Sequence, residues 1–168
     1  MELSVVVGNP KARSRTLAIA EAVAERVADA TGATVARTID LADHADDLFK
    51  WPHDGMAALN DAVAAGDYLV VASPTYKAAY TGLLKAFLDR YPNNGLGGVT
   101  AFPVMTGASL VHAMAIDTQL RPVLVELGAS VPTRGLFFEM PQMPELDAVV
   151  DAWAAEQLTR LSGSGVRA

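Results

Sequence analysis

Two short runs of aliphatic and β-branched residues, LSVVVG (3–8) and YLVVAS (68–73), constrain the fold more than any other feature of the chain. Neither run alternates with polar residues, a pattern typical of strands that are buried on both faces inside a parallel sheet. Weaker runs of the same kind are TVARTI (34–39), VTAFPVM (99–105) and SVPTRGLFF (130–138). Pro103 and Pro132 lie within the last two, which predicts that these strands are irregular or peripheral.

Helical stretches separate the strands. They are expected over 16–31, 55–66, 81–91, 109–127 and 144–161. In the first, Ile19, Val23 and Val27 recur at intervals of four residues, a spacing that predicts an amphipathic helix. Gly32 then provides a helix stop. Pro122 lies inside the fourth stretch and is expected to kink or divide it.

The alternation of strands and helices predicts an α/β protein with a doubly wound, five-stranded parallel sheet. The chain of 168 residues is long enough for one such domain and too short for two of ordinary size. We therefore expect a single domain over residues 1–161, followed by a frayed tail at 162–168.

Composition excludes several function classes. The formal net charge of −6 argues against a general nucleic-acid-binding protein, because such proteins carry a basic face. The absence of cysteine excludes disulfides, thiol nucleophiles and thiolate metal sites, and no metal site is expected. The chain shows neither a signal-peptide pattern nor an uninterrupted apolar run of about 18 residues. These features favour a cytoplasmic protein without a nucleic-acid or membrane partner.

The segment GNPKARSRT (8–16) joins the first strand to the first helix and is unusually basic for an acidic chain. Its cations and hydroxyls are Lys11, Arg13, Arg15, Ser14 and Thr16. Backbone N–H groups at a helix start, the helix dipole and these side chains together form a site for an anion. The segment lacks the G-x-G-x-x-G and P-loop patterns. A helix cap with solvated charges explains the same residues, so this loop alone leaves both interpretations open.

Two further loops follow the third and fourth strands: SPTYKAAYTG (73–82) and MTGASLVH (105–112). The first presents Tyr76 beside exposed amides, and Gly107 in the second allows a planar ligand to approach the backbone closely. Each loop alone is also explained as a turn with a helix cap. Ligands of open parallel sheets bind beyond the carboxyl ends of the strands. Together with loop 8–16, the two loops therefore describe a mononucleotide site, with the phosphate in the first loop and a ring against the others.

Residues 3–138 resemble, in order, the NADPH-dependent FMN reductases of flavodoxin-like fold. GNPKARSRT is similar to their G-S-x-R-x-x-S-x-[ST] phosphate loop. The stretch 73–124 resembles the branch that supplies reduced flavin to alkanesulfonate-type monooxygenases. Asn9 and Lys11 stand where the family usually has Ser and Arg, and Thr118 stands where the sulfonate branch tends to place an aromatic residue. The resemblance implies a flavodoxin-like sheet with strand order 2-1-3-4-5.

The resemblance also implies which residues bind FMN. Those around the phosphate are Asn9, Lys11, Ser14, Arg15 and Thr16. Those that line the flavin are Pro74, Thr75, Tyr76 and Lys77. Those that contact the isoalloxazine ring are Thr106, Gly107, Ala108 and Ser109.

The implied function is an NAD(P)H-dependent FMN reductase that transfers hydride from nicotinamide to FMN and supplies reduced flavin to a partner monooxygenase. Its implied cofactors are FMN and NADPH or NADH. The sequence offers no acid–base constellation, since His44, His53 and His112 are isolated and are interpreted as structural or solvent-facing. No catalytic side chain is expected, because the flavin itself carries out the difficult step.

Other functions and the assembly stay open at this point. One alternative keeps FMN as a prosthetic group and reduces a quinone, an azo dye or a metal oxyanion. A lower-ranked alternative is a flavodoxin-like electron carrier or a flavin-sensing binding module. A homodimer or homotetramer is also expected, because the apolar face of helix 80–91 exceeds what one chain's sheet is expected to cover. Assembly through this helix and the fourth is the family's habit.

Overall fold

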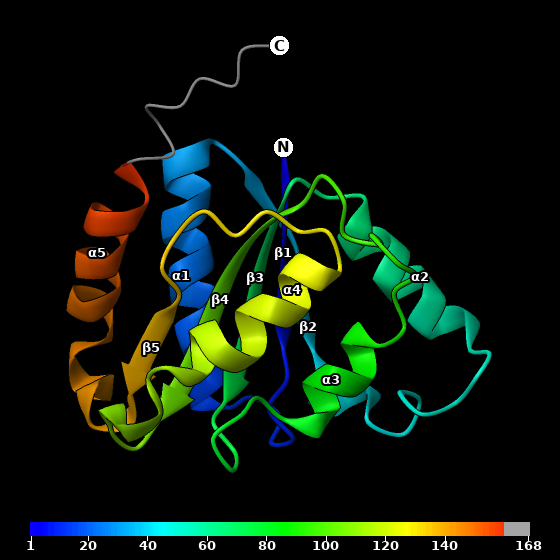
Figure 1. The fold of residues 1–168 in the computed structure, drawn as a ribbon. Helices are drawn as coiled ribbons and strands as arrows, with labels where there is room; N and C mark the ends of the chain where they lie inside the picture. The colour runs from blue at the N-terminus through cyan, green and yellow to red at the C-terminus, as the bar shows by residue number, and fades with distance from the viewer. Residues whose placement is uncertain (160–168) are drawn as a thin grey trace.

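Five parallel strands form the centre of the computed structural model, which describes residues 1–159 (Figure 1). They are β1 (Glu2–Val7), β2 (Thr34–Asp40), β3 (Tyr68–Pro74), β4 (Thr100–Gly107) and β5 (Leu136–Glu139). Their order in the sheet is β2-β1-β3-β4-β5, and every neighbouring pair is parallel. The predicted flavodoxin-like α/β fold is confirmed. The single domain over 1–161 stays a prediction, and residues 160–168, with the predicted tail, lie outside the described part.

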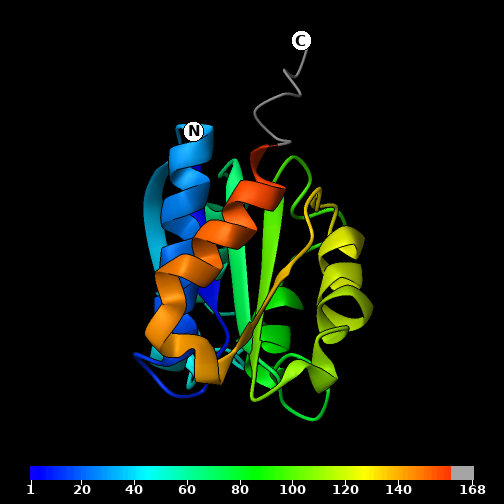
Figure 2. The ribbon, with the colours of Figure 1, turned by 90° about the vertical axis from the view of Figure 1, so that its left-hand side faces the viewer.

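Helices cover both faces of the sheet (Figure 2). They are α1 (Arg15–Thr31), α2 (Asp54–Ala64), α3 (Gly82–Leu88), α4 (Arg121–Glu126) and α5 (Leu146–Gln157). Helices α1 and α5 lie side by side on one face, and α2, α3 and α4 lie on the other. No helix within residues 1–159 is both long enough and apolar enough to cross a bilayer.

The side chains of β1 show why the strand sequence is apolar without alternation. Leu3, Val5 and Val7 pack into the core shared with α1 and α5. Val6 packs into the core on the opposite face, with α2, α3 and α4. All four side chains are buried, since helices cover both faces of the sheet at this strand.

Helix α1 begins and ends at the residues that its sequence predicts. The Ser14 hydroxyl accepts a hydrogen bond from the Leu17 N–H at 3.2 Å, as an N-cap residue does. Gly32 adopts a left-handed conformation with φ of +70°, and its N–H donates to the Ala28 carbonyl at 2.8 Å. Loop 8–16 therefore leads directly into a fixed helix N-terminus.

The segment expected as the fourth helix is divided, as Pro122 predicts. A 3₁₀ turn over Leu110–His112 and a π-helical turn over Ile116–Leu120 precede α4. Pro122 occupies the first turn of α4, where its missing N–H costs no helical hydrogen bond. The fifth strand is also shorter than predicted: Ser130 forms one isolated bridge with Thr100, and regular pairing starts only at Leu136.

The expectation of a surplus apolar face on helix 80–91 is wrong. The buried residues of this segment include Leu84, Phe87 and Leu88, which pack into the core of the same chain. Its remaining apolar residues, Tyr80, Leu83 and Ala86, are partly buried against that core. One chain therefore covers most of this face by itself.

Candidate functional site

The carboxyl ends of β1, β3 and β4 lead into three loops at one edge of the sheet, at the bottom of Figure 1. Loops 8–16, 73–82 and 105–112 border a single cleft of about 380 Å³, a volume typical of small-molecule sites. The residues that line it are Asn9, Lys11, Arg13, Ser14, Arg15, Thr16, Pro74, Thr75, Tyr76, Thr106, Gly107, Ala108 and Met140. The topology thus brings together segments that are far apart in the sequence.

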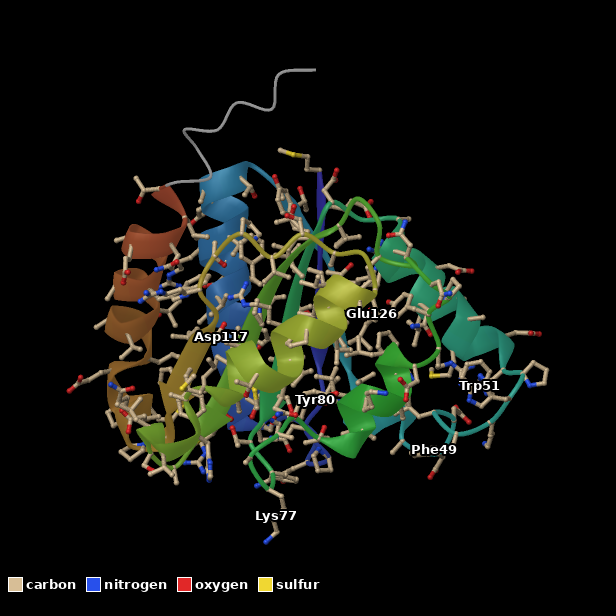
Figure 3. All side chains as sticks on the ribbon, viewed as in Figure 1. Phe49, Trp51, Lys77, Tyr80, Asp117 and Glu126 are labelled. Atoms are coloured by element: carbon tan, nitrogen blue, oxygen red, sulfur yellow. The ribbon has the colours of Figure 1, made fainter. Side chains whose placement is uncertain are left out.

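Two of the predicted site residues, Lys77 and Ser109, do not line the cleft. Lys77 points away from the body of the molecule (Figure 3). Ser109 is exposed and leads in an extended conformation into the 3₁₀ turn that follows. Conversely, Met140 lines the cleft without having been predicted, and so does Arg13, a cation of the predicted anion loop that the resemblance did not assign to FMN. Met140 directly follows β5, and no sequence motif marks it.

The start of α1 presents free donors to the cleft. The first hydrogen bond of the helix joins the Ala18 N–H to the Ser14 carbonyl at 3.3 Å. The N–H groups of Arg15 and Thr16 precede it, so they have no intrahelical acceptor. These two amides lie at the positive end of the helix dipole, and Lys11 and Arg15 line the same cleft, a combination that suits a phosphate group.

A chain of polar side chains holds loop 8–16 against β4. The Asn9 amide oxygen accepts the Lys11 N–H at 2.9 Å, which closes a local turn. The Asn9 amide nitrogen donates to the Thr16 hydroxyl at 3.0 Å. The hydroxyls of Thr16 and Thr106 lie 3.2 Å apart, and both residues are buried. Asn9, which replaces the Ser usual in the family, therefore fixes the shape of this loop.

Arg13 is engaged by carboxylates. Its guanidinium donates to Asp43 at 2.7 Å and to Asp40 at 3.2 Å, and these hydrogen bonds raise the pKa of Arg13. Of the three cations in the loop, Arg13 is thus compensated by acidic neighbours, and Lys11 and Arg15 are left to attract an anion. This arrangement is not visible in the sequence, because Asp40 ends a different strand, β2, and Asp43 follows it.

Loop 73–82 forms a tight hairpin at the rim of the cleft. The N–H of Tyr76 donates to the Ala79 carbonyl at 2.8 Å, and the reverse hydrogen bond measures 3.1 Å. Between them, Lys77 and Ala78 both adopt positive φ, at 50° and 64°, which is unusual for residues with a side chain. This turn directs Lys77 into solvent and leaves Tyr76 in the cleft wall with 52% of its surface exposed.

Two features of the cleft wall fit a planar polar ligand. The hydroxyl of Thr75 is shielded from water and has no hydrogen-bond partner within residues 1–159, so a polar atom of the wall remains unsatisfied. At Gly107, which lines the cleft, a Cβ atom would lie 2.6 Å from the Phe137 ring, so glycine lets the backbone pass close to that ring. Together with the amides of α1, these groups fit a flavin mononucleotide.

The histidines take no part in the cleft. His53 accepts the Met56 N–H at 3.2 Å and so caps α2, a structural role. Neither His44 nor His112 lines the cleft. In the described part of the chain, no group of three or more His, Asp or Glu side chains converges to hold a metal ion.

Known proteins similar to this chain also indicate a site for a flavin mononucleotide. The family model for NADPH-dependent FMN reductase matches residues 1–140. The FMN reductase (NADPH) of Pseudomonas putida is 33% identical over 156 residues, which cover 90% of this chain and 77% of that protein. The NADH-dependent FMN reductase SfnF of Pseudomonas putida is 31% identical over 138 residues, covering 79% of this chain and 74% of that protein.

A solved structure adds the comparison in three dimensions. An NADH:FMN oxidoreductase in its apo form superposes with a TM-score of 0.77 and 31% sequence identity, over 93% of this chain and 89% of that one. The family match spans most of the chain, and sequence and fold agree over nearly its whole length. The chain belongs to the NADPH-dependent FMN reductase family.

Proposed function

We propose that the protein is an NAD(P)H-dependent FMN reductase, which passes hydride from a reduced nicotinamide nucleotide to FMN held in the cleft of loops 8–16, 73–82 and 105–112. The observation that carries the proposal is the joining, in one cleft, of an anion site and a wall suited to a planar ring. Membership of the family and the names of its relatives support the same activity.

The FMN phosphate is proposed to bind at the start of α1. The amides of Arg15 and Thr16 donate to it, and the Ser14 hydroxyl, which already accepts the Leu17 N–H, has its proton free to donate as well. The positive charges of Lys11 and Arg15 attract the dianion. Because Lys11 offers a point charge where the family's Arg offers a bidentate fork, the amides carry more of the phosphate recognition here.

The flavin ring is proposed to lie against Thr75, Tyr76 and the backbone of 106–108. Bound FMN supplies the hydride-accepting chemistry, and the protein orients the ring and excludes water from one side of it. Tyr76 is the one aromatic residue in the cleft lining of the described chain. The opposite side of the ring is therefore left accessible to nicotinamide.

Stopped-flow mixing tests this function directly. FMN and the protein are mixed without oxygen with NADPH, and in parallel with NADH, and the absorbance of oxidised flavin is followed. The proposal expects bleaching much faster than in a protein-free mixture with at least one nucleotide. A rate equal to the protein-free rate with both nucleotides would reject it.

We further propose that reduced FMN leaves the cleft to supply a partner monooxygenase. The incomplete aromatic cover of the cleft supports this, because an electron carrier or an enzyme with a permanently bound flavin benefits from a more enclosed ring. Gel filtration after loading with FMN separates the alternatives. Loss of FMN on the column agrees with release, whereas retained FMN together with faster turnover of a quinone would favour the prosthetic-group alternative.

Assembly and location belong to the same proposal. A homodimer or homotetramer is proposed on the basis of the family's habit and of exposed apolar side chains at Leu110, Val111, Met114 and Val125, since helix 80–91 no longer supports it. Light scattering tests assembly: a strict monomer mass of 17.7 kDa would reject it.

A cytoplasmic location is also proposed and is tested by cell fractionation.

A further inference from the structure

Asp40 is a buried carboxylate at the edge of the proposed phosphate site. It is the last residue of β2 and pairs in register with Val7, the last residue of β1. Only 6% of its surface is exposed. A buried negative charge next to a site for a phosphate dianion is unfavourable unless it serves another purpose. Its contacts indicate what that purpose is.

Asp40 holds the backbone of loop 8–16. One of its carboxylate oxygens accepts the Arg13 N–H at 2.9 Å and the Arg13 guanidinium at 3.2 Å. The other oxygen faces the Ala42 N–H at 3.4 Å, at the start of the next turn. The contact to the Arg13 N–H is long-range, since it joins residues 27 positions apart, and it reaches the residue directly before the N-cap of α1.

Arg13 is strained at this position. Its φ is +54°, in the left-handed region that residues with a side chain adopt at a cost. The charged hydrogen bond from its own N–H to Asp40 offsets that cost. With Arg13 held in this conformation, the chain passes through the N-cap Ser14 to Arg15 and Thr16, which line the cleft.

The guanidinium of Arg13 completes the arrangement by compensating the charge of Asp40. Its second partner, Asp43, is exposed and makes no hydrogen bond to the backbone of loop 8–16. Arg13 therefore helps to fix the conformation of the loop. Its presence beside Lys11 and Arg15 is explained without assuming that all three cations bind phosphate.

We propose that Asp40 is a positioning residue for FMN binding, which acts through the backbone of Arg13 to hold the phosphate-binding amides in place. This inference rests on the proposed function, and it concerns only recognition of the phosphate. It predicts that loss of Asp40 weakens binding of FMN but not of riboflavin, which has the same ring without the phosphate.

Flavin binding to three variants tests the inference by quenching of flavin fluorescence, with no turnover involved. Asp40→Ala is expected to weaken FMN binding at least about tenfold, the scale of a lost charged hydrogen bond, and to change riboflavin binding less than about twofold. Asp40→Asn keeps an oxygen that accepts the Arg13 N–H, so it is expected to stay within about threefold of wild type. Asp43→Ala removes only the exposed ion pair and is expected to change FMN binding less than about twofold.

Each result bears on a different claim. If the Asp40→Ala variant binds FMN as tightly as wild type, or if its FMN and riboflavin binding fall together, the inference is wrong while the proposed function stands. If wild type binds neither flavin, the proposed function itself fails. Should Asp40→Ala not fold, Asp40→Ser takes its place. The serine hydroxyl lies one bond short of the position of the carboxylate oxygen, so this variant is also expected to lose FMN binding while keeping riboflavin binding.

Discussion

The two halves of the cleft are built in opposite ways. Hydrogen bonds within loop 8–16 and to Asp40 hold this loop in place, and its polar residues Ser14 and Thr16 are buried. Loop 73–82 instead exposes half of Tyr76 and turns through two residues with positive φ. The exposed apolar side chains of Leu110 and Val111 continue this open half. Loop 8–16, where the FMN phosphate is proposed to bind, is therefore held in shape by its own hydrogen bonds, whereas the half proposed to hold the ring is more exposed.

The largest expected effect is that of a methyl group added at the rigid end of the cleft. In Gly8→Ala, the new Cβ would lie 2.4 Å from the Cβ of Leu84, which is fully buried. Because helix α3 cannot yield there, we expect the free energy of unfolding to fall by about 3 kcal/mol in urea titrations.

Gly107→Ala is the matched change in the open half. Its Cβ would lie 2.6 Å from the tip of the Phe137 ring, which packs against the core but is only partly buried and so yields more readily than Leu84. We expect a loss of about 1 kcal/mol. If this variant lost as much stability as Gly8→Ala, the contrast between the two halves would not hold.

The next expected effect is a difference between FMN and riboflavin binding, which distinguishes the two halves of the cleft. Arg15→Gln removes a cation of the phosphate half, so we expect FMN binding to weaken about tenfold and riboflavin binding to stay unchanged. The difference is expected to shrink as salt concentration rises. Tyr76→Leu is expected instead to weaken both flavins alike, about threefold, because the ring contact is common to them. Calorimetric titration of both flavins into both variants makes the comparison.

A smaller effect concerns the strained hairpin of the open half. Ala78 has a φ of 64°, which glycine adopts without strain, so Ala78→Gly is expected to raise the free energy of unfolding by about 0.5–1 kcal/mol. Ala79→Gly in the same hairpin is the control. Ala79 does not have a positive φ, so its replacement is expected to lower stability. A loss of stability in both variants would show that the turn carries no strain.

The smallest expected effect is on the pH dependence of stability. It concerns Tyr80, at the inner end of loop 73–82, rather than the exposed turn at Lys77 and Ala78. Burial raises the pKa of Tyr80, so the folded protein keeps this phenol neutral at a pH where the unfolded chain ionises it. The stabilising contribution of Tyr80 is therefore complete below about pH 10 and is lost as the pH rises further. Tyr80→Phe is expected to show a shallower loss of stability above pH 10 in urea titrations. An identical slope in both proteins would contradict the burial of Tyr80.

Much of the fold follows from local sequence patterns. The strands over 3–8 and 68–73 are visible because a strand covered on both faces must be continuously apolar. The start of α1 is visible because Ser14 and Gly32 cap it at the expected spacing. Such features depend on residues close together in the sequence, so they can be predicted from the sequence alone.

Contacts between distant segments account for what the sequence did not reveal. The segment after Ser130 does not continue as a strand, and the guanidinium of Arg121 binds the carbonyls of Val131 and Thr133 there. The hold of Asp40 on Arg13 likewise depends on the pairing of β1 with β2. Lys77 was assigned to the site from its place in a motif, but the handedness of its turn directs it outward.

Calorimetric titration of wild-type protein with FMN and with riboflavin, at low salt, tests the central claim most directly. A cleft organised around a phosphate predicts that FMN binds at least about tenfold more tightly than riboflavin, with the advantage decreasing as salt is added. Equal affinities for the two flavins, or an advantage of FMN that salt does not change, would contradict it.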